Sequence, residues 1–189
     1  MPAVPNRPTT LAEFLAWEEL QPVRHEFDGA RPVAMAGGTL AHAAIQRNLA
    51  VALGSRLRGQ KCQFYGSDLK IEAAGRIRYP DGFVLCAPLP PGTTVVSNPV
   101  VVFEVLSAGT ASTDIVTKNN EYAATPSVRR YVILAQDRIG CAMFERLGED
   151  WDGHILGPDT VLKMPEIGID LPLTEFYADV DLAEPEPGA

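Results

Sequence analysis

Two acidic residues, Asp81 and Glu104, are the first candidates for chemistry in this sequence. Asp81 ends the segment 78–81 (RYPD), and Glu104 lies near the end of an apolar run over 100–106 (VVVFEVL). Burying a polar group without a partner costs roughly 2–7 kcal/mol, and burying a charge costs more. A hard divalent cation such as Mg²⁺, which takes oxygen ligands, is a partner that a second carboxylate from another strand would share. The alternative is a surface aspartate at a strand entry and an edge glutamate that points to solvent.

Composition limits how the protein can meet nucleic acid. The chain has 189 residues, a formal net charge of −8 and a pI of about 4.9. Non-specific affinity for nucleic acid comes from Lys and Arg that neutralise phosphates, so this charge argues against a general electrostatic attraction to nucleic acid. A nucleic-acid substrate would have to meet a local basic patch, and a homodimer would help to assemble one.

The cysteines and the N-terminus predict a cytoplasmic protein. Cys62, Cys86 and Cys141 lie far apart without C-x-x-C spacing, so we expect buried free thiols in a reducing compartment, and neither disulfides nor structural zinc. The Pro-rich segment 1–8 lacks the apolar stretch of a signal peptide, and no later run approaches the ~18 apolar residues of a membrane span.

The hydrophobic pattern predicts a single domain over 1–189, with an ordered core over about 10–177 and flexible ends over 1–8 and 182–189. Capping, turn and strand signals give the order helix, three strands, helix, strand, after an N-terminal helix and hairpin. The expected elements are a helix 10–20, a hairpin 25–33, a helix 39–58, strands 62–72, 77–86 and 100–106, a helix from 112 or 113 to 124, strands 130–135, 141–144, 151–155, 161–164 and 167–171, and a helical turn 173–177.

This order, together with Pro-Asp at 80–81 and EVLS at 104–107, resembles the PD-(D/E)XK nuclease superfamily and, within it, the Uma2 family of restriction endonucleases. The resemblance covers roughly 11–177 and rests on order and spacing. It includes FLAWE at 14–18, EFDG at 26–29, MAGG at 35–38, His42, GSDL at 66–69 and the helix 118–122. It implies an α/β (α+β) fold with a restriction-endonuclease-like core, in which helices flank a central mixed sheet in αβββαβ order, with extra C-terminal strands.

The resemblance also implies a metal centre. Asp81 and Glu104 would meet at one end of the sheet and bind one or two Mg²⁺ or Mn²⁺ ions, which activate a water and offset charge on the phosphate. The superfamily has a lysine two residues after the second acid, where this chain has Leu106. Lys118 on the following helix is the expected replacement. The alternative for Lys118 is an exposed helix lysine paired with Asp114 or Glu121.

Several further residues are accessory candidates, each with an ordinary structural alternative. Lys70 competes for the lysine role, although a charge on a sheet edge is the favoured interpretation of it. Glu26 is a third acid that would complete the metal shell, or else a solvated hairpin charge. His42 would contact phosphate or position a carboxylate, or else cap and pack the long helix, and no histidine is expected as a metal ligand.

The remaining candidates lie after Glu104 and before Asp81. The Ser107 hydroxyl would reach phosphate oxygens, or else belong to a plain strand-to-helix turn. Tyr122, one helical turn beyond Lys118, would support the site or fill the core. Arg76 and Arg78 lie on the strand that leads to Asp81 and are weak candidates for DNA contact, with solvated surface charges as the alternative.

These observations predict a Mg²⁺-dependent DNA endonuclease that hydrolyses phosphodiester bonds with a metal-activated water. Two alternatives stay open. One is a catalytically silent homologue that binds nucleic acid or protein, which Leu106 in place of lysine and the net charge of −8 favour. The other is a metal-dependent hydrolase of a small phosphoester, for which acidity is no handicap.

Overall fold

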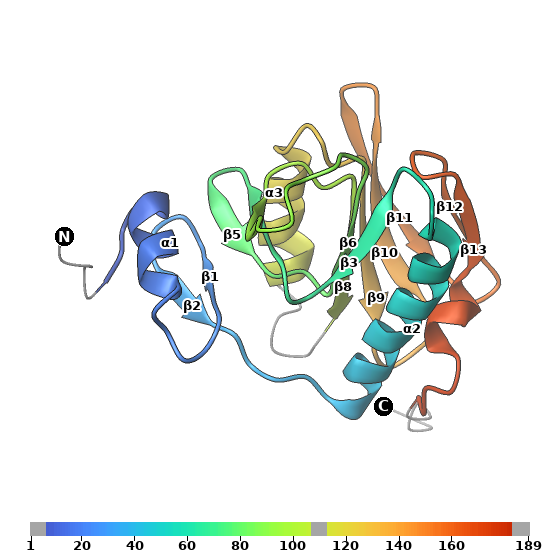
Figure 1. The fold of residues 1–189 in the computed structure, drawn as a ribbon. Helices are drawn as coiled ribbons and strands as arrows, with labels where there is room; N and C mark the ends of the chain where they lie inside the picture. The colour runs from blue at the N-terminus through green and yellow to red at the C-terminus, as the bar shows by residue number, and fades with distance from the viewer. Residues whose placement is uncertain (1–6, 107–112, 183–189) are drawn as a thin grey trace.

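The computed structural model describes residues 7–106 and 113–182, and its fold is a mixed α+β one (Figure 1). The ends that the sequence predicts to be flexible lie mostly outside these residues. In chain order the elements are α1 (Leu11–Glu18), β1 (His25–Phe27), β2 (Pro32–Ala34), α2 (Leu40–Leu57), β3 (Gln63–Gly66), β4 (Lys70–Ala73), β5 (Arg76–Arg78), β6 (Gly82–Leu85), β7 (Val95–Val96), β8 (Val101–Leu106), the π-helix η1 (Thr113–Lys118), α3 (Asn119–Ala123), β9 (Arg130–Ala135), β10 (Cys141–Leu147), β11 (Asp150–Leu156), β12 (Val161–Met164), β13 (Ile169–Pro172) and the 3₁₀ turn η2 (Leu173–Tyr177).

The main sheet has six strands in the order β11-β10-β9-β8-β6-β3. Its central pair, β8 and β9, is parallel, and the other neighbours are antiparallel. Side chains alternate across β8, so that Phe103 packs with Leu49 of α2 on one face and Val102 packs with Tyr122 of α3 on the other. Because helices cover both faces, β8 is apolar along almost its whole length, as the sequence shows.

A second sheet, in the order β2-β1-β5-β4-β7, lies beside the first. Helix α1 packs on it through Phe14, which stacks on Phe27 at a centroid distance of 5.1 Å and shares a small core with Ile77 and Tyr79. Figure 1 shows α1 and the β1–β2 hairpin on the side of the molecule away from α2. The connection between hairpin and α2 runs through residues 35–39.

Two of the predicted strands are wrong as continuous strands. The segment 62–72 divides into β3 and β4, and 77–86 divides into β5 and β6, with one half of each in each sheet. A break at Pro80 has a physical reason, since proline lacks the N–H that a ladder requires. Asp81 therefore lies where the chain passes from the second sheet into the main sheet.

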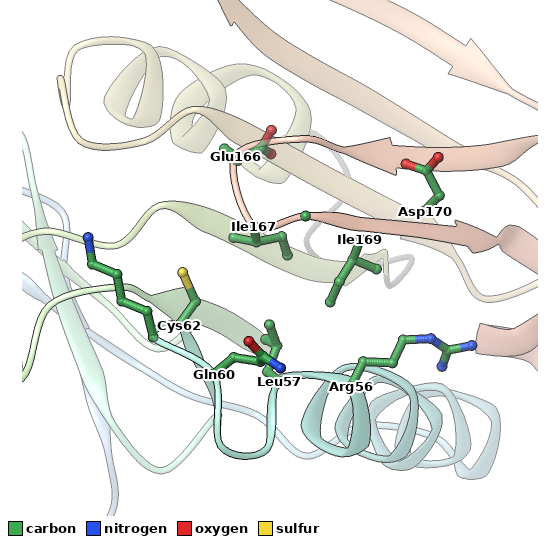
Figure 2. Close-up of a pocket in the computed structure, with 10 residues that line it drawn as sticks. Arg56, Leu57, Gln60, Cys62, Glu166, Ile167, Ile169 and Asp170 are labelled. Atoms are coloured by element: carbon green, nitrogen blue, oxygen red, sulfur yellow. The ribbon is translucent and has the colours of Figure 1, made fainter.

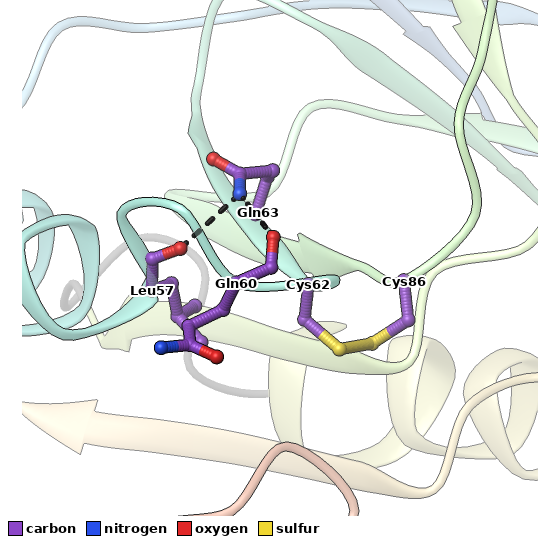
Figure 3. Close-up of a disulfide and its surroundings, with 5 residues drawn as sticks. All are labelled: Leu57, Gln60, Cys62, Gln63 and Cys86. Atoms are coloured by element: carbon purple, nitrogen blue, oxygen red, sulfur yellow. Dashed lines mark hydrogen bonds between the residues drawn. A yellow bond between two sulfur atoms is a disulfide. The ribbon is translucent and has the colours of Figure 1, made fainter.

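The prediction of three free thiols is also wrong. Cys62 and Cys86 form a disulfide (Figure 3), and only Cys141 is a buried free thiol. Because Gln63 pairs with Leu85 in the antiparallel β3–β6 ladder, the next position outward sets Cys62 opposite Cys86. Within the described residues, no helix is long and apolar enough to cross a membrane.

Candidate active site

Asp81 is held in place by groups from α2 and β8. It directly precedes β6, whose Gly82 pairs with Phe103, so Asp81 lies beside Glu104 on the neighbouring strand. The N–H of Val105 donates to Asp81 Oδ2 at 2.6 Å, and the Gln46 side-chain amide donates to Oδ1. His42 Nε2 lies 3.3 Å from Oδ2. Contacts from α2 on one side and from β8 on the other thus fix the orientation of the Asp81 carboxylate.

Helix α2 presents His42 and Gln46 on one face because they are four residues apart. Thr39 caps the helix and accepts a hydrogen bond from the N–H of His42. Gly38 permits the close approach of the imidazole, since a Cβ at this position would lie 2.8 Å from His42 Nδ1. The structure therefore favours the carboxylate-positioning role of His42.

Glu104 and Lys118 are both buried, with relative exposures of 5% and 6%. Lys118 Nζ donates to Glu104 Oε1 at 2.8 Å and lies 3.6 Å from Glu26 Oε1. The solvent-facing alternatives for Glu104, Lys118 and Glu26 do not hold. The ammonium that the sequence lacks at Leu106 reaches Glu104 from η1 instead.

Glu26 and Arg78 extend this charge network into the second sheet. Glu26 accepts hydrogen bonds from Arg78 Nη1 at 3.0 Å and from the N–H of Tyr79 at 3.1 Å. Arg78 also donates twice to Glu121, at 2.7 and 2.6 Å. Burial lowers the pKa of Arg78, but the Glu121 hydrogen bonds and the charges of Glu26 and Glu121 outweigh it, so the net pKa is raised.

Arg78 is 2% exposed and therefore has no surface for the DNA contact predicted from the sequence. Arg76 is partly exposed, but its guanidinium donates to Asp28 O and Ala74 O and pairs with Glu121 at 3.2 Å. Both arginines hold the loops and carboxylates around the site.

Tyr122 is fully buried and packs edge-on against Tyr131 at a centroid distance of 4.6 Å. Among the residues that the structure describes, its hydroxyl has no hydrogen-bond partner. Burial raises the pKa of Tyr122 well above its usual value, and the negative charge of Glu104 raises it further. Tyr122 thus packs in the core, and its hydroxyl is close enough to Glu104 for the charge of Glu104 to affect its pKa.

Lys70, another candidate, does not join this cluster. Lys70 is buried on β4, an interior strand of the second sheet, and pairs with Glu18 at 2.6 Å; it is not the sheet-edge charge that the sequence favours. Tyr79 also donates to Glu18, at 2.9 Å. Ser107 lies outside the described residues.

Sequence reasoning missed Gln46 and Glu121. Gln46 had a usable signal, because it lies four residues after His42 and therefore on the same helix face. Glu121 appeared only as a surface partner of Lys118, and its pairing with Arg78 depends on how α3 packs on β5, which no local pattern indicates.

The donor set fits a Mg²⁺ or Mn²⁺ ion. Asp81, directly before β6, and Glu104, on the neighbouring β8, would supply hard oxygen ligands. Mg²⁺ is usually held by one or two carboxylates while it keeps several waters. In the described parts of the chain, no group of three or more His, Cys, Asp or Glu side chains is placed to hold a metal. The fit is thus to a hydrated ion on two carboxylates, and not to a cage of protein ligands.

Comparisons with known proteins identify the family and the fold. A family model named Uma2 and described as "Putative restriction endonuclease" matches residues 11–174. Two relatives, each named only as an uncharacterized protein of Synechocystis sp., are similar in sequence. One is 29% identical over 181 residues, covering 93% of this chain and 95% of the relative. The other is 27% identical over 146 residues, covering 74% and 82%.

A crystal structure titled "a putative nuclease belonging to DUF820", from Anabaena variabilis, has the same fold. The TM-score is 0.73 at 16% identity, and the match covers 90% of this chain and 98% of the other. At this identity the likeness concerns the fold alone.

Proposed function

The chain belongs to the Uma2 family of restriction-endonuclease-like proteins, and from this premise we propose that it is a Mg²⁺- or Mn²⁺-dependent DNA endonuclease. The observation that carries the proposal is the convergence of Asp81, Glu104 and Lys118 at the end of β8. Two hard oxygen ligands suit a metal ion that activates water, and a nearby ammonium suits the charge that develops on the phosphate.

Asp81 and Glu104 would hold the cation. When bound, the cation lowers the pKa of a coordinated water and offsets negative charge on the phosphate. Asp81 brings a fixed geometry, because Gln46, His42 and the N–H of Val105 restrain its carboxylate. Such restraints on a ligand typically change metal affinity or activity by 10–100-fold.

Lys118 would act on the phosphate. Its ammonium is positioned beside Glu104 before any substrate arrives, so it would stabilise the added negative charge of the pentacoordinate phosphorus without reorganisation. Glu26 would serve as a positioning residue for Lys118, because its Oε1 lies 3.6 Å from the Lys118 ammonium while Arg78 and the N–H of Tyr79 hold its carboxylate in place.

Nicking of supercoiled plasmid with Mg²⁺ or Mn²⁺ tests the proposal. We expect nicking by the wild type, a loss of at least ~10²-fold in Asp81→Asn and Glu104→Gln, and no activity with EDTA. Asp137→Asn is the matched control, because Asp137 is a surface residue paired with Arg138. Equal nicking by all four proteins would exclude Asp81 and Glu104 from the reaction.

The net charge of −8 favours one second candidate, a hydrolase of a small phosphoester. Bis(p-nitrophenyl) phosphate is the probe. Hydrolysis that needs Asp81 and Glu104, without plasmid nicking, would select this function. Inactivity on both substrates would select the silent binding module, in which Lys118 and Glu104 simply neutralise each other.

A further inference from the structure

A cavity of about 530 Å³ lies at the end of the main sheet opposite Asp81. One wall is the end of α2 and its turn into β3, and it includes Arg56, Lys61 and Cys62. The other wall is the turn between β12 and β13, with Glu166, and the start of β13, with Asp170 (Figure 2). β6 connects the two ends of the sheet, from Gly82 beside Asp81 to Leu85 beside Cys86.

The Cys62–Cys86 disulfide reaches this cavity through one sulfur. Cys62 lines the cavity, and Figure 2 shows its sulfur pointing into the space between the two walls. Cys86 is absent from the described lining, although both cysteines are partly exposed. Access decides which sulfur of a disulfide a thiolate attacks, so Cys62 is the electrophilic sulfur here. Cys141 is excluded as a competing thiolate because it is buried and burial raises its pKa to about 12.

The walls carry charges of both signs. Lys61 is exposed, and Arg56 is close by but shares its guanidinium with Glu175 at 2.9 Å. On the opposite wall Asp170 is exposed, whereas Glu166 is held by Arg130 at 2.7 Å. A small molecule with both carboxylate and ammonium groups is complementary to this pair of walls.

We propose that Cys62 is a reversible thiolation site for a low-molecular-weight thiol that carries carboxylate and ammonium groups. The thiolate attacks Cys62 Sγ, the bond to Cys86 breaks, and Cys86 leaves as a thiolate. A second molecule of the thiol then attacks the mixed disulfide, which leaves both cysteines reduced and releases the small disulfide. Two thiols supply the two electrons, so no other reductant is needed.

This inference is independent of the proposed nuclease function. Exposed disulfides have higher reduction potentials than structural ones and are the labile, regulatory or catalytic ones. The Cys62–Cys86 bridge is partly exposed at both cysteines and borders a charged cavity. The bridge also closes the segment 62–86, which contains Asp81.

The first test uses reduced glutathione as the probe on the oxidised wild-type protein, with acid quenching and peptide mass mapping. We expect the first glutathionyl group on Cys62. A group on Cys86, an equal distribution between the two, or three free thiols in the purified native protein would overturn the proposal.

The second test compares rates of disulfide opening by glutathione and by 2-mercaptoethanol, which is neutral apart from its thiol. Lys61→Glu should lower the glutathione rate by about threefold to tenfold and leave the 2-mercaptoethanol rate unchanged. Arg138→Glu makes the same charge change at an exposed residue in the β9–β10 turn, at the far end of β9, and should alter neither rate. Equal slowing of both reagents by Lys61→Glu would contradict a charged binding site.

Discussion

Glu104 and Lys118 form a buried ion pair at the centre of the site. Removing one partner of such a pair leaves an uncompensated charge and typically costs 3–5 kcal/mol. A cation beside Glu104 would supply the charge that Lys118 now provides. On the proposed function, the pair would therefore link the stability of the fold to metal binding.

Lys118→Met should lower the free energy of unfolding by about 3 kcal/mol, because Glu104 and Glu26 lose a positive charge. Added Mg²⁺ should recover part of this loss, and stabilise the variant more than the wild type. Urea unfolding with and without Mg²⁺ measures both effects. The double variant Glu104→Gln/Lys118→Met is the control and should not respond to the metal. An equal Mg²⁺ effect in Lys118→Met and wild type would contradict the link.

Glu18 gives a prediction about acid stability. Burial raises the pKa of its carboxyl, but hydrogen bonds from Lys70 and Tyr79 and the charge of Lys70 outweigh it, so the net pKa lies below the ordinary 4.5. A group with a lowered folded pKa contributes stability above its unfolded pKa and loses it as pH falls. Denaturation from pH 7 downward should therefore steepen below 4.5 in the wild type. Glu18→Gln should reduce that slope, and an unchanged slope would argue against the pairing with Lys70.

Among the elements, the disulfide between β3 and β6 should stabilise the fold by constraining the unfolded chain. Its sequence separation is 24 residues, for which loop-closure entropy gives about 3.5 kcal/mol. Cys62→Ala/Cys86→Ala should lose this amount in urea unfolding. With dithiothreitol, wild type and variant should differ little. A large difference that persists in dithiothreitol would mean that packing of the two side chains, and not the cross-link, is responsible.

The loop before α2 is expected to control the geometry of Asp81. Gly38→Ala would place a Cβ 2.8 Å from His42 Nδ1 and push the ring away from Asp81. We expect Mn²⁺ affinity to fall by roughly tenfold, with little change in stability. Gly37→Ala is the matched control, because a Cβ added at Gly37 would have no other atom within 4 Å. Equal Mn²⁺ affinities of Gly38→Ala and Gly37→Ala would mean that His42 does not contribute to metal binding.

The elements show how far local pattern determines this fold. β9, β12 and η2 begin and end at the predicted residues, because apolar runs between turn residues mark them. The divided strands were not predictable in the same way. A strand that changes sheets at Pro80 keeps its apolar alternation, so periodicity alone indicates a continuous strand.

The candidate site likewise has a part that the sequence predicts and a part that it does not. Asp81 lies next to Glu104 because it directly precedes β6, which pairs with β8. Lys118 reaches Glu104 from the helical segment that follows β8. The burial of Arg78, the Glu26–Arg78–Glu121 contacts and the Cys62–Cys86 bridge depend on strand register and on packing between sheets. These are long-range pairings with no sequence motif.

At the scale of the whole molecule, the site is assembled from both sheets. Glu26 comes from the second sheet, Glu104 from the main sheet, and Asp81 from the junction between them. Metal binding, on the proposed function, would therefore depend on how the two sheets are docked. A homodimer, which would bring the basic residues of two acidic chains to one DNA, stays a prediction that sedimentation equilibrium would check.

Calorimetric titration of Mn²⁺ into the wild type and Glu104→Gln, with Asp137→Asn as the surface control, tests the metal centre most directly. We predict saturable binding to the wild type and Asp137→Asn, and its loss in Glu104→Gln, because one of two carboxylate ligands is removed. The same binding isotherm for Glu104→Gln and the wild type would contradict a metal centre on Asp81 and Glu104.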